Sequence, residues 1–130
     1  MLGSNRSGGP VHRIGAGATI EGTVRFSGRL EIEGTVLGVV IADPAEGSEV
    51  VVGSKGRVQG EISAESIVVS GRVEGPVRSS VRLDILAGAR LEGDVGYRDL
   101  QIQHGAIVEG SLKPLESEQV ALKLVANSRI

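Results

Sequence analysis

Short apolar–polar alternations separated by glycine recur along most of the chain. Alternation of this kind predicts short β-strands with one buried face. Consecutive glycines at the centre of the pattern apolar-x-Gly-x-apolar are 15 to 22 residues apart. The widest spacing contains ADPAEGSE (42–49), a cluster of turn-forming residues that predicts a surface loop. A nearly constant spacing predicts a repeat architecture. The central glycines are Gly22, Gly38, Gly60, Gly75, Gly93 and Gly110.

A finer period lies inside the first repeats. Ile14, Ile20, Phe26 and Ile32 are each six residues apart, and three such intervals make about one repeat. Each repeat would therefore contain three short strands and three bends, which glycine permits because it lacks a Cβ. Such coils stack with parallel strands about 4.8 Å apart. The sequence predicts an all-β fold, a parallel β-helix of about six coils in which each coil contacts only its neighbours.

The repeats divide the chain into three parts. Residues 14–112 are predicted to form the β-helix core. Residues 1–13, rich in glycine and serine, are predicted to be a disordered tail. Residues 113–130 form a C-terminal segment that is expected to add a last strand and then a tail, with a short amphipathic helix as the alternative. The apolar residues of this segment that alternate with polar or small ones are Val120, Leu122 and Leu124.

Composition narrows the possible chemistry. The chain has 130 residues with 20 glycines, one Phe, one Tyr and no Trp, so its core must be filled by aliphatic side chains. It has no cysteine, which excludes disulfides and thiolate chemistry. The net charge is −2, and acidic and basic residues are interspersed along the chain, so the sequence predicts no basic patch that could bind nucleic acid. Neither a secretory signal nor a long apolar run is found, so we expect a cytoplasmic protein.

With the repeats aligned, the chain resembles the bactofilins, a family of bacterial cytoskeletal proteins that form polymers. The resemblance is carried by the I-G-x-G opening at 14–17, the run TVRFSGRLEIEG at 23–34 and the recurring V-x-G-x-V units. It implies a right-handed, three-sided β-helix that assembles into filaments without nucleotide or any other cofactor. It also implies a scaffold role for cell-shape, cell-wall or appendage machinery, often at the inner membrane.

The ends of such a solenoid are the expected contact surfaces. An end coil has unpaired N–H and C=O groups beside an apolar cross-section, and monomeric solenoids cover these with polar caps. The first coil here is small and apolar, which favours an end-to-end homopolymer. Bactofilins often use a phenylalanine near the end of the core, whereas Phe26 is near the start, so leucines are expected to replace it. The predicted interface residues are Ile14, Ile20, Val24 and Phe26 in the first coil, and Leu112, Leu122 and Leu124 near the C-terminus.

The N-terminal tail offers a candidate membrane contact. Some bactofilins are tethered to the membrane by a short apolar and basic start, and here Leu2 and Arg6 would form that tether. One leucine and a few basic residues bind a bilayer weakly, so a free tail is the alternative. The remaining expected partners are cell-wall enzymes or other scaffold clients.

An enzyme is the alternative function. Six-residue periodicity is also typical of trimeric, left-handed β-helix acyltransferases, in which His104 would be the general base. The related carbonic anhydrases bind zinc through three histidines, and this chain has only His12 and His104. The stretch GSKG (53–56) lacks the Ser or Thr that follows Lys in a phosphate-binding loop. No catalytic, cofactor or metal site is therefore predicted.

Charged residues recur in register with the repeats. Stacked glutamates would repel one another unless basic residues lie beside them. We therefore predict a charge-balanced, solvated face, with a docking stripe for a protein partner as the alternative. The glutamates are Glu21, Glu74, Glu92 and Glu109, and the expected partners are Arg57, Arg72 and Arg90.

Overall fold

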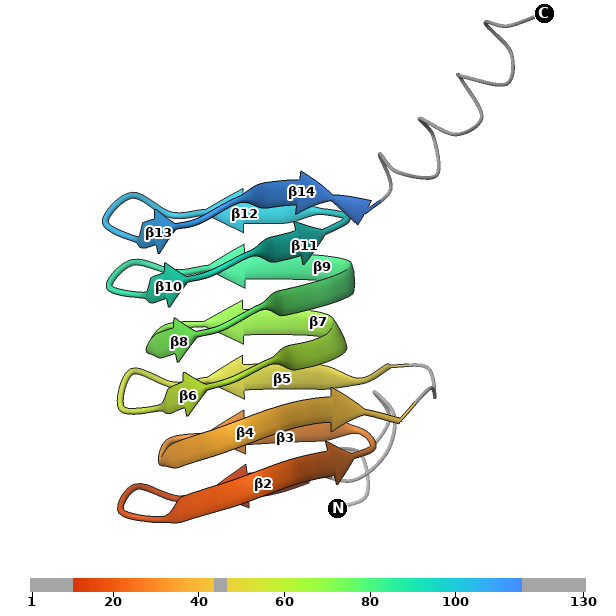
Figure 1. The fold of residues 1–130 in the computed structure, drawn as a ribbon, viewed down its shortest axis with the longest axis vertical. Helices are drawn as coiled ribbons and strands as arrows, with labels where there is room; N and C mark the ends of the chain where they lie inside the picture. The colour runs from red at the N-terminus through yellow and green to blue at the C-terminus, as the bar shows by residue number, and fades with distance from the viewer. Residues whose placement is uncertain (1–10, 44–46, 116–130) are drawn as a thin grey trace, which may run out of the picture.

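A computed structural model describes residues 11–43 and 47–115. Its elements are parallel β-strands that stack as the successive coils of a β-solenoid of about six turns (Figure 1). This arrangement confirms the predicted all-β parallel β-helix. The strands are β1 Val11–Ile14, β2 Thr19–Phe26, β3 Arg29–Ile32, β4 Thr35–Ala42, β5 Glu49–Val52, β6 Arg57–Gln59, β7 Ile62–Val69, β8 Arg72–Glu74, β9 Val77–Ile85, β10 Arg90–Glu92, β11 Val95–Tyr97, β12 Leu100–Ile102, β13 Ile107–Glu109 and β14 Leu112–Pro114.

Strand segments from successive coils pair in register and form three stacks. The first stack contains β1, β3, β5, the second halves of β7 and β9, and β12. The second contains the first halves of β2 and β4, followed by β6, β8, β10 and β13. The third contains the second halves of β2 and β4, the first halves of β7 and β9, then β11 and β14.

The central glycines form one bend between the second and third stacks. Gly38, Gly60 and Gly75 have φ angles of 148°, 144° and 141°, which side chains with a Cβ rarely adopt. They also lie directly on one another, since a Cβ on Gly60 would collide with the carbonyl oxygen of Gly38. The repeated glycine is therefore required both by backbone conformation and by the close approach of neighbouring coils.

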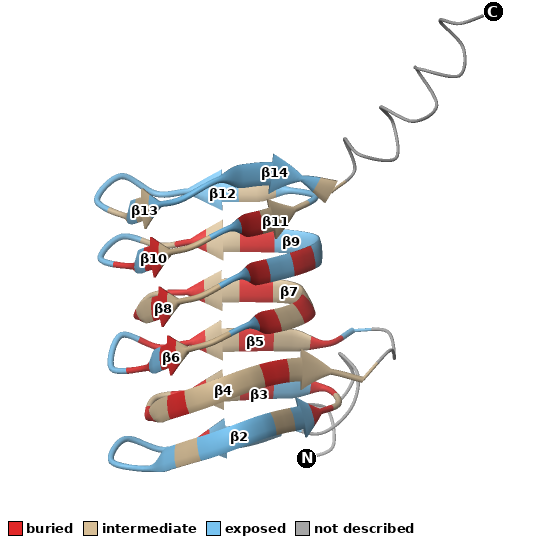
Figure 2. Ribbon diagram, in the orientation of Figure 1, coloured by how far each residue is buried: buried red, intermediate tan, exposed pale blue. Residues whose placement is uncertain are grey.

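Inside the solenoid, equivalent aliphatic residues form columns along its axis. One column of the first stack contains Ile14, Ile32, Val52, Val69 and Ile85, which are 0 to 6% exposed. The buried positions follow this interior through the middle coils, while the first and last coils are more exposed (Figure 2). Stacks of similar aliphatic side chains fill the narrow interior, which explains how the chain folds with so few aromatic residues.

The strand boundaries differ slightly from those expected. β1 begins at Val11, three residues before the expected start of the core, because Val11–Ile14 pairs with Arg29–Ile32. At the other end, β14 continues to Pro114 by pairing with β11. Between β4 and β5, Asp43, Gly47 and Ser48 lie outside strands, as predicted for the loop in the widest repeat spacing.

Candidate end-to-end interfaces

The first coil has a strand neighbour on one side only. Its strands β1 and β2 pair with β3 and β4 of the second coil, and neither pairs with another described strand. Their outward N–H and C=O groups therefore face the end of the rod. An edge of this kind can template the pairing of another strand.

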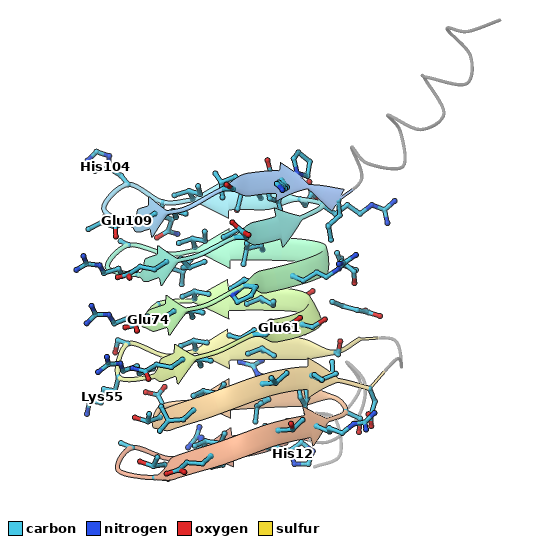
Figure 3. The ribbon with its side chains drawn as sticks, in the orientation of Figure 1. His12, Lys55, Glu61, Glu74, His104 and Glu109 are labelled. Carbon is cyan, nitrogen blue, oxygen red and sulfur yellow. The ribbon has the colours of Figure 1, made fainter. Side chains whose placement is uncertain are left out.

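The structure brings the four N-terminal candidates together in this coil. Ile14 and Phe26 are buried, while Ile20 and Val24 are half-buried and pack against the core. Each of the four is in register with an aliphatic residue one coil further along. Side chains from all three stacks therefore form an apolar surface at this end of the solenoid. The exposed His12, on β1 beside this apolar surface, was not among the predicted interface residues (Figure 3).

The last coil exposes more apolar surface than the first. Leu112 is 41% exposed and stacks on Val95, which is buried. Ile102 is 45% exposed and continues the column of Ile85. Sequence reasoning missed Ile102, although it precedes a glycine-containing bend just as Ile14 and Ile32 do. The predicted interface residues Leu122 and Leu124 lie outside the described residues.

Along the side of the rod, charged residues neutralise one another. Arg72 contacts Glu74 in its own coil at 3.2 Å and Glu92 in the next coil at 3.9 Å. The same diagonal arrangement joins Arg57 to Glu74, and Arg90 to Glu92 and Glu109. The predicted charge-balanced face is therefore present from β6 to β13, with Glu74 and Glu109 labelled in Figure 3. Glu21 stands apart, because threonines Thr19 and Thr35 take the place of arginine in the first two coils.

A second group of ion pairs links the first three coils. The Arg13 guanidinium donates a hydrogen bond to Glu31 at 2.9 Å, and Arg29 contacts Glu31 at 3.0 Å and Glu49 at 3.5 Å. The hydrogen bond from Arg13 is the main cause that holds the pKa of Glu31 below its ordinary value, with the Arg29 charge adding to it. These partly exposed ion pairs join the first coil to the second and the second coil to the third.

The residues considered for enzyme chemistry lie at bends. His104 is exposed at the tip of the turn between β12 and β13, and Lys55 is exposed at the tip of the turn between β5 and β6 (Figure 3). The Gly56 N–H donates to the Gly53 carbonyl at 2.9 Å, so GSKG forms a bend of the solenoid. Within residues 11–43 and 47–115, no three His, Asp or Glu side chains are grouped to hold a metal ion.

The candidate membrane contact falls elsewhere in the chain. Leu2 and Arg6 lie outside the described residues. The part of the chain that the structure describes contains no helix of the length and apolarity needed to span a bilayer.

Comparison with known proteins identifies the family. The family model described as "Bactofilin: Polymer-forming cytoskeletal" matches residues 12–113, which is most of the chain and nearly all of the solenoid. The chain is also 29% identical over 99 residues to Bactofilin BacO of Myxococcus xanthus (strain DK1622), covering 76% of this chain and 75% of that protein. No solved structure matches the chain. The chain therefore belongs to the bactofilin family of polymer-forming cytoskeletal proteins.

Proposed function

We propose that this bactofilin polymerises end to end without nucleotide and acts as a cytoplasmic scaffold rather than as an enzyme. The observation that carries the proposal is the contrast between the ends and the sides of the rod. Among the described residues, both end coils are apolar and have strand edges without a neighbour, whereas the ladder from β6 to β13 neutralises its own charges. Of the five large apolar side chains that are well exposed among the described residues, Ile102 and Leu112 lie at the open face of the last coil, where they continue the buried columns of Ile85 and Val95.

A second copy placed on an end would continue the contacts already present within the chain. Its strands would pair with the free edge, and its inward side chains would cover residues such as Ile20 or Ile102. Burial of apolar surface is favourable at about 25 cal/mol per Å². In a right-handed, three-sided β-helix, which the family resemblance implies, six coils at about 4.8 Å make a subunit of about 29 Å.

Such a filament would bind other proteins without catalysing a reaction. Its length would display repeated side surfaces to clients such as cell-wall or appendage machinery, and Leu2 with Arg6 would contribute contact with the inner membrane. These finer roles follow from the family resemblance and are part of the proposal. The polymerisation step depends only on the two end coils.

Arginine substitutions at the ends test this step. Ile20→Arg and Ile102→Arg would each place a charge in the contact, and we expect each to abolish long polymers in a sedimentation assay. Both sites are partly exposed in the monomer, unlike the buried Phe26, so the fold should tolerate them. Val81→Arg is the matched control, because Val81 is 48% exposed on the side of the rod.

The products also report how the ends meet. If like ends meet, Ile102→Arg leaves dimers joined through their first coils, and Ile20→Arg leaves dimers joined through their last coils. If unlike ends meet, either variant leaves monomers. Wild-type sedimentation of both variants, with circular dichroism showing an intact fold, would contradict end-to-end assembly.

A further inference from the structure

A histidine ends one of the inward columns at the first coil. Residues in register on neighbouring strands point to the same face of a sheet. His12 on β1 is in register with Leu30 on β3, which is 2% exposed and points into the core. From Leu30 the column continues through the rod with aliphatic side chains, which are Val50, Ile67, Leu83 and Leu100. His12 therefore takes the place of an aliphatic side chain at the N-terminal end of the core (Figure 3).

The surroundings of His12 on this inward face are apolar. The inward residues of β2, in the same coil, are Ile20, Val24 and Phe26, and β4 in the second coil has no charged residue. The charged residues of β1, β2 and β3 alternate with inward positions and so lie on the outer face. They are Arg13, Glu21, Arg25, Arg29 and Glu31. Asp43, which follows β4, pairs with Arg25 at 4.0 Å on that outer face.

A positive charge on the imidazole of His12 would therefore meet no carboxylate among the described strands of the first two coils. In the free protein this has little consequence, because His12 is exposed and water can solvate either form. In a contact between ends it matters, since burial in apolar surroundings disfavours the charged form of histidine. Histidine is also the side chain whose charge ordinarily changes between pH 5 and 8.

We propose that His12 makes assembly through the first coil sensitive to pH, because the imidazole has to be neutral when a second copy covers this end. The inference rests on the proposed end-to-end assembly and adds its regulation. A second copy that continues the columns encloses His12 between Leu30 and its own apolar end coil. Protonation then opposes the contact, so acid shortens the polymers and a rise in pH restores them.

The size of the effect depends on how the ends meet. For a histidine that titrates as it does in model peptides, exclusion of the charged form lowers the association constant about fourfold between pH 8 and pH 6. A contact between unlike ends contains one His12. A contact between two first coils contains two, so the same change in pH lowers its association constant about sixteenfold.

Sedimentation of the full-length chain at pH 8 and pH 6 tests the inference. Both values lie above the isoelectric point of about 5.7, so the protein keeps a negative net charge. The measured quantity is the protein concentration above which polymers form. For wild type we expect this threshold concentration to be at least about fourfold higher at pH 6 than at pH 8.

Variants at the two histidines of the chain assign the effect. His12→Leu matches the aliphatic column and should give the same threshold concentration at both pH values. His12→Lys keeps a charge at both and should assemble poorly at both. His104→Gln is the matched control, because it removes the other histidine, at an exposed bend, and should respond to pH as wild type does.

Three results would overturn the inference while leaving end-to-end assembly in place. The first is an equal wild-type threshold concentration at pH 8 and pH 6. The second is an unchanged response in His12→Leu, since every other group that titrates in this range remains in that variant. The third is loss of the fold at pH 6 by circular dichroism, because acid would then act on the coils and not on the contact. Wild type that forms no polymer at either pH would instead contradict the proposed function, and this inference with it.

Discussion

At the residue scale, glycine decides whether neighbouring coils can approach one another. Gly38, Gly60 and Gly75 combine a positive φ with backbone contact to the glycine of the coil before. The glycine spacing in the sequence predicts a bend at these positions. It does not predict the direct stacking of the bends, because that contact depends on the register between coils. Gly15 differs from them, since a Cβ on it would meet no atom within 4 Å.

Gly60→Ala tests this requirement. We expect it to lower the free energy of unfolding by about 2–4 kcal/mol, because the methyl group adds a backbone clash to an unfavourable φ. Gly15→Ala is the control, and a surface change of this kind should stay within about 0.5 kcal/mol. Chemical denaturation followed by circular dichroism measures both. A Gly60→Ala protein as stable as Gly15→Ala would mean that the bends are looser than described.

The lowered pKa of Glu31 predicts that the stability of the first coils depends on pH. Its pKa is lowered in the folded state, so its carboxylate stabilises the fold fully above the unfolded-state pKa of about 4.3. That stabilisation is lost as the pH falls through the lower folded-state pKa. Glu31→Gln should therefore reduce the acid sensitivity of thermal unfolding, whereas Glu21→Gln, at a site without a described ion pair, should leave it unchanged. Identical acid profiles for wild type and Glu31→Gln would contradict this role.

At the element scale, alternation within each strand separates core from surface. The repeating glutamates and arginines correctly predicted the outward ladder, and the residues between them correctly predicted the buried column. The bend between the third and first stacks was harder to predict, because no turn signal recurs there from one repeat to the next. In β9 the buried Ser79 hydroxyl donates to the Glu65 carbonyl at 2.8 Å and approaches the Arg82 carbonyl at 2.6 Å. Apolar–polar alternation predicts that a serine points outward. The inward position of Ser79 could therefore not be predicted from the sequence.

Substitutions at two adjacent positions of β8 compare the stability contributed by an outward residue with that contributed by an inward residue. Arg72→Gln removes contacts to Glu74 and Glu92, but exposed ion pairs contribute only about 0–1 kcal/mol. Val73→Ala, at a fully buried neighbour, should cost about 2 kcal/mol through lost burial and an unfilled cavity. Urea unfolding at low and high salt distinguishes them, because only the Arg72→Gln difference should shrink with salt. A larger loss for Arg72→Gln than for Val73→Ala would mean that the ladder holds the coils together.

At the scale of the whole molecule, the solenoid has two ends that its own coils leave uncovered. The six-residue period relates Ile14, Ile20 and Phe26, and the structure places these three in the first coil together with Val24. The period drifts after Val36, so Ile102 in the last coil was missed. At the C-terminal side, alternation alone left strand and helix open for residues 113–130, and Leu122 and Leu124 lie outside the described residues.

Fibre diffraction from purified protein, assembled without nucleotide, tests end-to-end stacking most directly. If coils stack between subunits as they do within them, filaments should give a meridional reflection at about 4.8 Å. The axial repeat should be about 29 Å if unlike ends meet and about 58 Å, or two subunits, if like ends meet. Protein that stays dispersed at high concentration would contradict this account. Filaments whose 4.8 Å reflection lies on the equator would contradict it too, because their rods would then be joined by their sides.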